Sequence, residues 1–343
     1  MSELPNRPQR PRVLSGMRPT GKLHLGNYMG ALANWVKLQD QYECYFFIAD
    51  WHALTTDYAD TSQVTGNIKE VLLDYLAAGL DPAKSVIFLQ SRVPQHAELA
   101  LLLGMSTPLG WLERVPSYKE MQENLTSRDL TTYGFLGYPV LMSADILLYQ
   151  PDFVPVGQDQ QAHVELTREI ARRFNQFYRL NEREVLPEPK VLLTPSPKLP
   201  GTDGRKMSKS YGNTILISDP EPVVRQKLKT MVTDPARIRR TDKGDPDKCP
   251  VGDLHKVFST PETMAKVYEG CRSAAIGCIE CKGWAADALV QVLAPMQERR
   301  AQITEPQALE ILEEGSRRAE ARAEQTMIEV REAMKMPLST VKP

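Results

Sequence analysis

Short apolar runs alternate with helix-like segments through the first half of the 343-residue chain, and this alternation constrains the fold more than any other feature. A continuous apolar run is typical of a strand buried on both faces, as in a parallel sheet. The runs lie at residues 13–16, 45–50, 86–90 and 153–157, and the helix-like segments at 26–39, 61–79, 98–103, 140–149 and 162–178. The pattern predicts an α/β fold with a doubly wound, Rossmann-like parallel sheet.

The character of the sequence changes near residue 195. Residues 194–204 are rich in Pro and Gly, which predicts a loop, and from residue 219 onward the pattern is mostly helical. Residues 1–11 carry prolines and charges, so we expect a short disordered tail there. We therefore predict an α/β domain at 12–213 and an all-helical domain at 214–343.

Composition excludes some classes of protein. The net charge is −1, so any contact with nucleic acid must come from local basic patches. The sequence contains no run of about 18 apolar residues, and its first residues lack the apolar core of a signal peptide. We therefore expect no membrane association and a cytoplasmic location, where cysteines stay reduced.

Two segments far apart in the sequence suit the phosphates of a nucleotide. The first, residues 19–27, reads PTGKLHLGN, and the second, residues 206–210, reads KMSKS. In the first, Gly21 and Gly26 allow the backbone to approach a ligand at a helix start, where unpaired N–H groups attract phosphate. In the second, two flexible ammonium groups suit a departing pyrophosphate. Taken separately, the first segment also fits a glycine turn with a surface histidine, and the second also fits a solvated basic loop.

The two segments together resemble the two signatures of the class I aminoacyl-tRNA synthetases. His24-Leu25-Gly26-Asn27 resembles the first signature, and residues 206–210 match the second letter for letter. Asn27 replaces the last histidine of the first signature, a change typical of the tryptophanyl branch. Residues 138–149, 155–160 and 163–168 are also similar to that branch.

The resemblance implies a bacterial-type tryptophanyl-tRNA synthetase. Such an enzyme activates L-tryptophan with ATP and Mg²⁺ to the adenylate and transfers it to tRNA(Trp), and the family acts as a homodimer. The helical domain would then bind the tRNA anticodon. No covalent nucleophile is needed, because the substrate carboxylate attacks the α-phosphorus and catalysis consists of positioning and charge stabilisation.

The resemblance also assigns site residues. It implies catalytic roles for His24, Asn27, Lys206, Ser208 and Lys209. It implies an ATP site made of Arg18, Pro19, Thr20, Gly26, Asn27, Gly157, Gln158, Asp159, Leu199, Lys206, Met207, Ser208, Lys209 and Ser210. It implies a tryptophan pocket made of Asp145, Met142, Gln160, His52 and Leu14.

Asp145 stands out on physical grounds. It lies in an otherwise apolar helix, where a carboxylate is costly unless it is paired. An ionised carboxylate only accepts hydrogen bonds and an indole N–H only donates, so the two satisfy each other. Met142, three residues earlier on the same helix face, would contact the ring. The alternative is that Asp145 pairs with groups of the protein itself.

Four of the five cysteines, Cys249, Cys271, Cys278 and Cys281, fall within one short stretch, whereas Cys44 opens an apolar strand and is expected in the core. Four clustered thiols in a reducing compartment suggest a metal site, which fits a structural Zn²⁺ or a [4Fe–4S] cluster. The spacing resembles the motif of the iron–sulfur subset of the family, although the first gap is about one residue shorter. Zn²⁺ and the absence of any metal remain alternatives.

The basic residues at 237–243 lie just before Cys249 and favour contact with RNA phosphates. Three other functions compete with the one above. A tyrosyl-tRNA synthetase shares the fold and both signatures. A small-acid nucleotidyltransferase has a similar histidine loop but would lack the helical, cysteine-bearing domain. A non-catalytic relative, or a duplicated synthetase with a regulatory task, is the third alternative.

Overall fold

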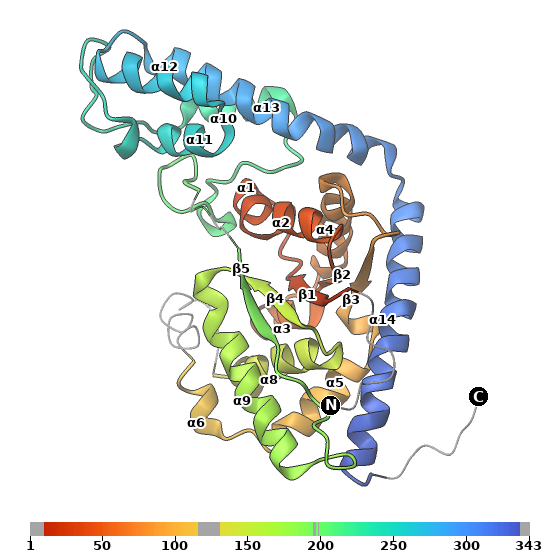
Figure 1. Cartoon of the computed structure of the whole chain (residues 1–343). Coiled ribbons are helices and arrows are strands. Elements are labelled where there is room, and N and C mark those ends of the chain that lie inside the picture. Colours follow the sequence, from red (N-terminus) through yellow and green to blue (C-terminus); the bar gives the residue numbers. More distant parts are fainter. Residues whose placement is uncertain (1–9, 116–130, 195–196, 198, 337–343) are drawn as a thin grey trace.

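A five-stranded parallel sheet organises the first half of the chain in the computed structural model (Figure 1), which describes residues 10–115, 131–194, 197 and 199–336. The strand order is β3-β2-β1-β4-β5. The strands are β1 (Arg12–Met17), β2 (Glu43–Ile48), β3 (Ser85–Leu89), β4 (Phe153–Val156) and β5 (Lys190–Leu193). The predicted doubly wound sheet is confirmed. The expected tail at 1–11 lies almost wholly outside the described residues.

The sheet register aligns the carboxyl ends of the central strands. Val13 of β1 pairs with Cys44, and Met17 pairs with Ile48, at opposite ends of the same ladder. Val13 also pairs with Phe153 of β4. The chain order reverses between β1 and β4, and the crevice at such a switch point is where α/β sheets bind ligands.

The helices that cover the sheet match the sequence pattern in most places. They are α1 (Leu25–Asn27), a π-helical turn (Tyr28–Leu32), α2 (Ala33–Leu38), α3 (Asp50–Asp57), α4 (Val64–Ala78), α5 (Gln95–Gly104), α6 (Leu109–Leu112), α8 (Tyr133–Leu148) and α9 (Gln161–Phe177). The segment predicted as one helix at 26–39 is continuous but contains the π-helical turn. α8 begins seven residues before the predicted start at Val140, because Thr132 caps it by accepting a hydrogen bond from the N–H of Phe135.

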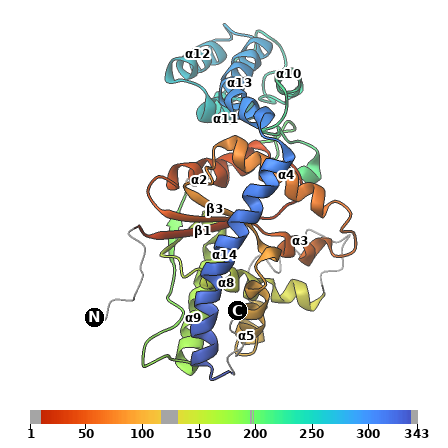
Figure 2. The same cartoon turned by 90° about the vertical axis from the view of Figure 1, so that its right-hand side faces the viewer.

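The second half is helical, as predicted. Its helices are α10 (Glu221–Thr230), α11 (Pro250–Phe258), α12 (Pro261–Arg272), α13 (Cys278–Gln302) and α14 (Glu305–Ala333). Helices α10 to α12 and the first turns of α13 form a lobe above the sheet, and α14 runs down the side of the α/β unit beside β3 (Figures 1 and 2). The α14 helix therefore covers the edge strand of the sheet, although it belongs to the segment predicted as a separate helical domain.

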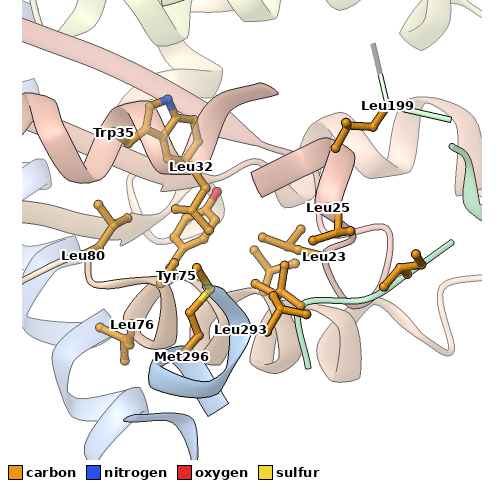
Figure 3. Packing of buried hydrophobic residues seen from close by; sticks show 14 of the residues in the cluster. Leu23, Leu25, Leu32, Trp35, Tyr75, Leu76, Leu80, Leu199, Leu293 and Met296 are labelled. Carbon is orange, nitrogen blue, oxygen red and sulfur yellow. The ribbon is translucent and has the colours of Figure 1, made fainter. Parts of the chain in front are cut away.

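Two hydrophobic clusters lie on the two faces of the sheet. Successive β2 residues point to opposite sides, so Phe46 belongs to one cluster and Phe47 to the other. In the first cluster the ring of Trp35 stacks on Phe46 at 4.8 Å between centroids. Leu293 and Met296 of α13 belong to this same cluster (Figure 3), so this long helix of the second half shares a core with the α/β unit.

In the part of the chain that the structure describes, no helix has both the length and the apolar character needed to cross a membrane.

Candidate active site

A cavity of about 430 Å³ opens where the carboxyl ends of β1 and β4 separate, a size typical of small-molecule sites. The structure brings all five residues of the predicted tryptophan pocket to its wall: Leu14, His52, Met142, Asp145 and Gln160. Of the predicted ATP residues, Arg18 and Gly157 also line it. Leu14 belongs to β1, His52 to α3, Met142 and Asp145 to α8, and Gln160 to the short 3-10 turn Gln158–Gln160, so four segments of the α/β unit build one cavity.

The Asp145 carboxylate is buried and already has four hydrogen-bond contacts within the protein. His52 Nε2 lies 2.8 Å from Oδ2, and Gln90 Nε2 donates to both carboxylate oxygens at 2.8 and 2.9 Å. His96 Nδ1 lies 2.6 Å from Oδ1. Burial by itself would raise the pKa of Asp145, but His96 and His52 outweigh it and hold that pKa below its usual value. The internal pairing considered as an alternative is therefore present in this structure.

Two of these partners were not predicted from the sequence. His96 is fully buried on α5, and its Nε2 lies 2.9 Å from the hydroxyl of Tyr149, so its two ring nitrogens bridge Asp145 and Tyr149. Gln90 directly follows β3 and is also fully buried. Its place at the carboxyl end of a predicted strand was the one sequence signal that could have revealed it.

His24 and Asn27 form a reciprocal cap at the start of α1. The Asn27 side-chain oxygen accepts from the N–H of His24 at 3.1 Å, and the Asn27 N–H donates to His24 Nδ1 at 3.3 Å. Because Nδ1 accepts, the proton of the neutral ring lies on Nε2. Burial, followed by the nearby charge of Lys209, lowers the pKa of His24 to about 4. His24 is therefore a neutral donor near pH 7.

Lys209 of the second signature reaches the first signature directly. Its Nζ donates to the carbonyl oxygen of Gly21 at 2.8 Å and to Thr20 Oγ1 at 3.3 Å. Burial lowers the pKa of Lys209 to about 8, and the charge of Asp74 partly opposes that shift. Among the described residues, the hydrogen bonds of the ammonium group thus go to neutral oxygens of the loop, so its charge remains available to an anion.

The backbone also joins the two signature regions. The N–H of Leu25 donates to the carbonyl of Ile215 at 2.9 Å, and the N–H of Ile217 donates to that of Leu23 at 3.0 Å. Asn213 is buried, and its amide accepts from the N–H of Ser208 at 2.8 Å and donates to the carbonyl of Lys206 at 3.2 Å. The structure therefore places residues 206–210 beside His24, as the sequence pairing implied.

The remaining residues of the predicted ATP site differ in exposure. Lys206 and Ser210 are exposed, and the Ser208 and Ser210 hydroxyls lie 2.9 Å apart. Leu199 and Met207 are buried in the core cluster that contains Leu25, so their side chains hold the lysine loop against the His24 segment. Pro19 is buried, Gly26 is half-buried, and Gln158 is exposed. The side chain of Asp159 lies outside the described part of the chain.

The four clustered cysteines lie in the helical lobe. Cys249 immediately precedes α11, Cys271 lies near the end of α12, and Cys278 and Cys281 lie in the first turn of α13. All four thiols are free. Burial and, to a smaller extent, the charges of the other three cysteines together raise the pKa of Cys281 to about 12, so these three thiols lie close to it. Within the described residues, however, no three Cys, His, Asp or Glu side chains are arranged as ligands of one metal ion.

Arg237 corrects one expectation about RNA. Its guanidinium is buried and donates to the carbonyls of Ile276 at 2.5 Å and Arg240 at 3.1 Å, and it lies 3.6 Å from Cys271 Sγ. These contacts occupy it inside the protein, so it is not an RNA-facing residue. Arg239, Arg240 and Lys243 are exposed.

A family model described as tRNA synthetases class I (W and Y) matches residues 6–294. The chain belongs to this family. The tryptophan–tRNA ligase of Thermotoga maritima is 52% identical, with 95% of this chain and 99% of that protein covered. The tryptophan–tRNA ligase of Ralstonia nicotianae is 47% identical, with 96% and 99% covered.

Solved structures of the family are similar throughout. The crystal structure of tryptophanyl-tRNA synthetase from Campylobacter jejuni, complexed with ADP and tryptophan, aligns with a TM-score of 0.84 at 32% identity and covers 95% of this chain and all of that one. A tyrosyl-tRNA synthetase from Archaeoglobus fulgidus aligns with a TM-score of 0.64 at 23% identity, which establishes a shared fold only.

Proposed function

We propose that this protein is a tryptophan–tRNA ligase, which activates L-tryptophan with ATP and transfers it to tRNA(Trp). The observation that carries this proposal is the cavity that Met142 and Asp145 line together with Arg18, which directly precedes the first signature segment, in a chain 52% identical to a tryptophan–tRNA ligase. The match to both W and Y enzymes leaves tyrosine as the competing substrate.

In the proposed tryptophan site, the indole ring occupies the cavity between Leu14 and Met142, and Gln160 holds the α-amino or carboxylate end. Because the protein already occupies both oxygens of Asp145, the indole N–H shares Oδ2 with His52 or takes its place. His52 also lines the cavity, so the incoming ring meets this hydrogen bond first. His96 and Gln90 keep the carboxylate ionised and aimed while that exchange occurs.

In the proposed ATP site, the adenine and ribose lie near Gly26, Asn27 and Gly157, and the phosphates extend toward Lys206 and Lys209. The neutral His24 donates from Nε2 to a phosphoryl oxygen. Lys209 exchanges its contacts with neutral oxygens for a phosphate oxygen, a gain because a charge-assisted hydrogen bond is stronger than a neutral one. Mg²⁺ enters with ATP as part of the substrate.

The chemistry of the first step needs no covalent intermediate with the protein. The tryptophan carboxylate attacks the α-phosphorus, the bond from that phosphorus to the α,β-bridging oxygen breaks, and pyrophosphate leaves with the electron pair. Lys206 and Lys209 stabilise the charge that grows on the leaving group. In the second step the terminal adenosine of the tRNA attacks the mixed anhydride and AMP leaves.

Pyrophosphate exchange into ATP, measured separately with each amino acid, tests the proposal. We expect exchange with tryptophan and at least about 100-fold less with tyrosine or phenylalanine, because neither side chain carries an N–H donor where the indole N–H would meet Oδ2 of Asp145. Equal or faster exchange with tyrosine would assign the protein to the other branch of the family. The absence of exchange with any amino acid would support a non-catalytic relative.

For the four cysteines we propose a [4Fe–4S] cluster, with Zn²⁺ as the alternative. The fit rests on the chemistry of the donor set: the free thiols of Cys249, just before α11, Cys271 on α12 and Cys278 on α13 all raise the pKa of Cys281, and Cys278 and Cys281 share one helical turn. A bound cluster would join the three helices of the lobe, a structural role that requires no electron transfer.

Metal analysis separates these alternatives. Anaerobically purified protein should contain about four iron and four sulfide per chain. Cys281→Ser should lower the iron content and the thermal stability of the lobe together, whereas Cys44→Ser, which changes the core cysteine, should leave the iron content unchanged. Stoichiometric zinc would instead identify the alternative, and protein free of both metals would refute a metal site.

We propose that the protein acts as a homodimer through one apolar face of the α/β unit. Exposed apolar side chains gather at the ends of α5, α6, α8 and α9: Leu101, Met105, Leu109, Tyr133 and Phe177. Arg173 links them, because it donates to the Ser106 carbonyl and its guanidinium lies 5.2 Å from the Phe177 ring. Met105→Glu should give a monomer by light scattering, and the control Ile238→Glu, on the helical lobe, should not.

For the tRNA we propose that the helical lobe contacts the anticodon end, with Arg239, Arg240 and Lys243 facing RNA phosphates. Their exposure beside the cysteine cluster supports this role.

ATP and tRNA are both cytoplasmic substrates, and we accordingly propose a cytoplasmic location for the protein.

A further inference from the structure

One buried carboxylate outside the predicted site contacts both the first signature segment and the C-terminal helices. Asp74 lies in α4 and is fully buried. Its Oδ2 accepts from the N–H of Leu23 at 2.8 Å, and its Oδ1 pairs with the guanidinium of Arg300 on α13. The carboxylate thus joins the residue that precedes His24 to a helix more than two hundred positions later.

Arg300 has a second partner, whose contact with the first signature segment is an ion pair with the Lys22 side chain rather than a hydrogen bond to the backbone. Its Nη2 pairs with the carboxylate of Glu70, one turn before Asp74 on the same helix. Glu70 is partly exposed and lies 3.9 Å from Lys22. The chain therefore offers a matched control, because Glu70 shares Arg300 with Asp74 but makes no hydrogen bond to the backbone of residues 23–27 in the described structure.

The position of Asp74 is costly to maintain for stability alone. A buried carboxylate needs both its charge and its lone pairs compensated, and an apolar residue would fill the same interface without that cost. The α13 helix already packs its Leu293 and Met296 into the core cluster, so the interface does not need an ion pair to form. The pair of Asp74 and Arg300 adds a fixed position for the backbone N–H of Leu23.

The same carboxylate also acts on the lysine loop. Its negative charge stabilises the protonated form of Lys209 and opposes the effect of burial on that group. On the α13 side, Gln297 donates to the carbonyl of Asp219 at 2.6 Å, in the segment that follows the lysine loop. Helix α13 therefore makes polar contacts next to both signature segments. Arg300 reaches the first segment through Asp74, and Gln297 contacts the chain just after the second segment.

We propose that Asp74 and Arg300 are a positioning pair that fixes the backbone of the His24 segment relative to α13 and thereby sets the affinity of the enzyme for ATP. The inference rests on the proposed assignment of that segment to the ATP phosphates. Asp74 does not touch the substrate. It acts through the Leu23 N–H, and displacements of about 1 Å in such a loop lower the rate strongly.

Steady-state pyrophosphate exchange with the full-length protein tests the pair. Asp74→Asn retains the shape of the side chain but removes the charge that pairs with Arg300, and Arg300→Met retains the length of the side chain but removes its charge. We expect each variant to raise KM for ATP by about tenfold, the effect of losing one charge-assisted hydrogen bond. KM for tryptophan should stay within about twofold, because no residue of the pair lines the tryptophan cavity.

Controls distinguish positioning from general destabilisation. Glu70→Gln should leave both KM values within about twofold, and Arg300→Lys, which keeps the charge, should fall between wild type and Arg300→Met. The double variant Asp74→Asn with Arg300→Met should be no worse than the poorer single variant, because the two residues act as one unit. Arg300 is partly exposed, so its variants keep the test open if Asp74→Asn does not fold.

Two outcomes would overturn the inference. One is an equal effect of Glu70→Gln on KM for ATP, and the other is a parallel rise in both KM values that follows the loss of thermal stability. His24→Ala and Lys209→Ala separate this failure from failure of the site assignment. If these two variants leave KM for ATP unchanged, the assignment of the segment to ATP is wrong. If they raise it while the Asp74 and Arg300 variants do not, only the positioning role fails.

Discussion

The ammonium group of Lys209 donates a 2.8 Å hydrogen bond to the carbonyl oxygen of Gly21, 188 residues earlier in the chain. The contact joins the two sequence signatures in the absence of any ligand. It also leaves the lysine with no carboxylate among the hydrogen-bond partners that the described structure gives it. Because the Lys209 ammonium group bonds only weakly to the neutral oxygens of Gly21 and Thr20, it can exchange these contacts for a bond to an anion.

The lowered pKa of Lys209 predicts how ATP use depends on pH. Its pKa in the folded protein is about 8, compared with 10.5 for an unperturbed lysine. The charged form is therefore present below pH 8 and is lost as the pH rises through 8. We expect kcat/KM for ATP, which reports on the free enzyme, to fall above about pH 8. Lys209→Arg should move this fall to higher pH, because a guanidinium remains charged. An identical profile for the two proteins would remove Lys209 from the ATP step.

The buried network around Asp145 predicts the effect of an isosteric substitution. Asp145→Asn removes the charge that His96 and His52 stabilise, and we expect kcat/KM for tryptophan to fall by about 100-fold while KM for ATP changes little. Ser143→Ala is the matched control. Ser143 is equally buried on α8, but it bonds to Pro139 and Thr167 rather than facing the cavity. Equal losses in the two variants would mean that the network only supports the fold.

The crossing of α14 over β3 predicts a strong glycine requirement. A Cβ at Gly315 would lie 1.8 Å from the carbonyl oxygen of Ile87, which is backbone and cannot move aside easily. Gly315→Ala should therefore destabilise the protein by ~2 kcal/mol or more. Gly66→Ala, in α4 with nothing near the added atom, should instead be neutral or stabilise by up to ~1 kcal/mol. Thermal unfolding of both variants checks the pair, and similar melting temperatures would contradict the tight crossing.

The sequence was most informative where local pattern and burial coincide. The runs that became β2 and β3 are mostly apolar, the β1 run opens with Val13 and Leu14, and each strand was predicted within one or two residues of its bounds. β5 was missed, because this four-residue edge strand has exposed ends at Lys190 and Leu193 and an apolar run of only three residues. α3 was missed because its residues 50–57 follow the strand directly and show little helical periodicity.

The candidate site shows the same division. Met142 and Asp145 could be paired from the sequence because they lie three apart on one helix. His96 could not, because it reaches Asp145 from α5 and nothing in its own segment distinguishes it from an ordinary polar residue. Gln90 was marked only by its place at the carboxyl end of a predicted strand, which does not show that it reaches Asp145. The buried position of Arg237 was equally hidden, since a basic residue is expected at the surface unless its partners are known.

By itself the sequence determined the sheet, the helical second half and the two signatures, because these depend on period, apolar runs and short motifs that act locally. Only the tertiary structure decided which groups the buried charges use: Asp145 with two histidines and a glutamine, Asp74 with Arg300, and Lys209 with a backbone carbonyl. The physical reason is that pairing a buried charge depends on segments that are distant in sequence meeting at one point, and that meeting follows from the packing of the whole chain.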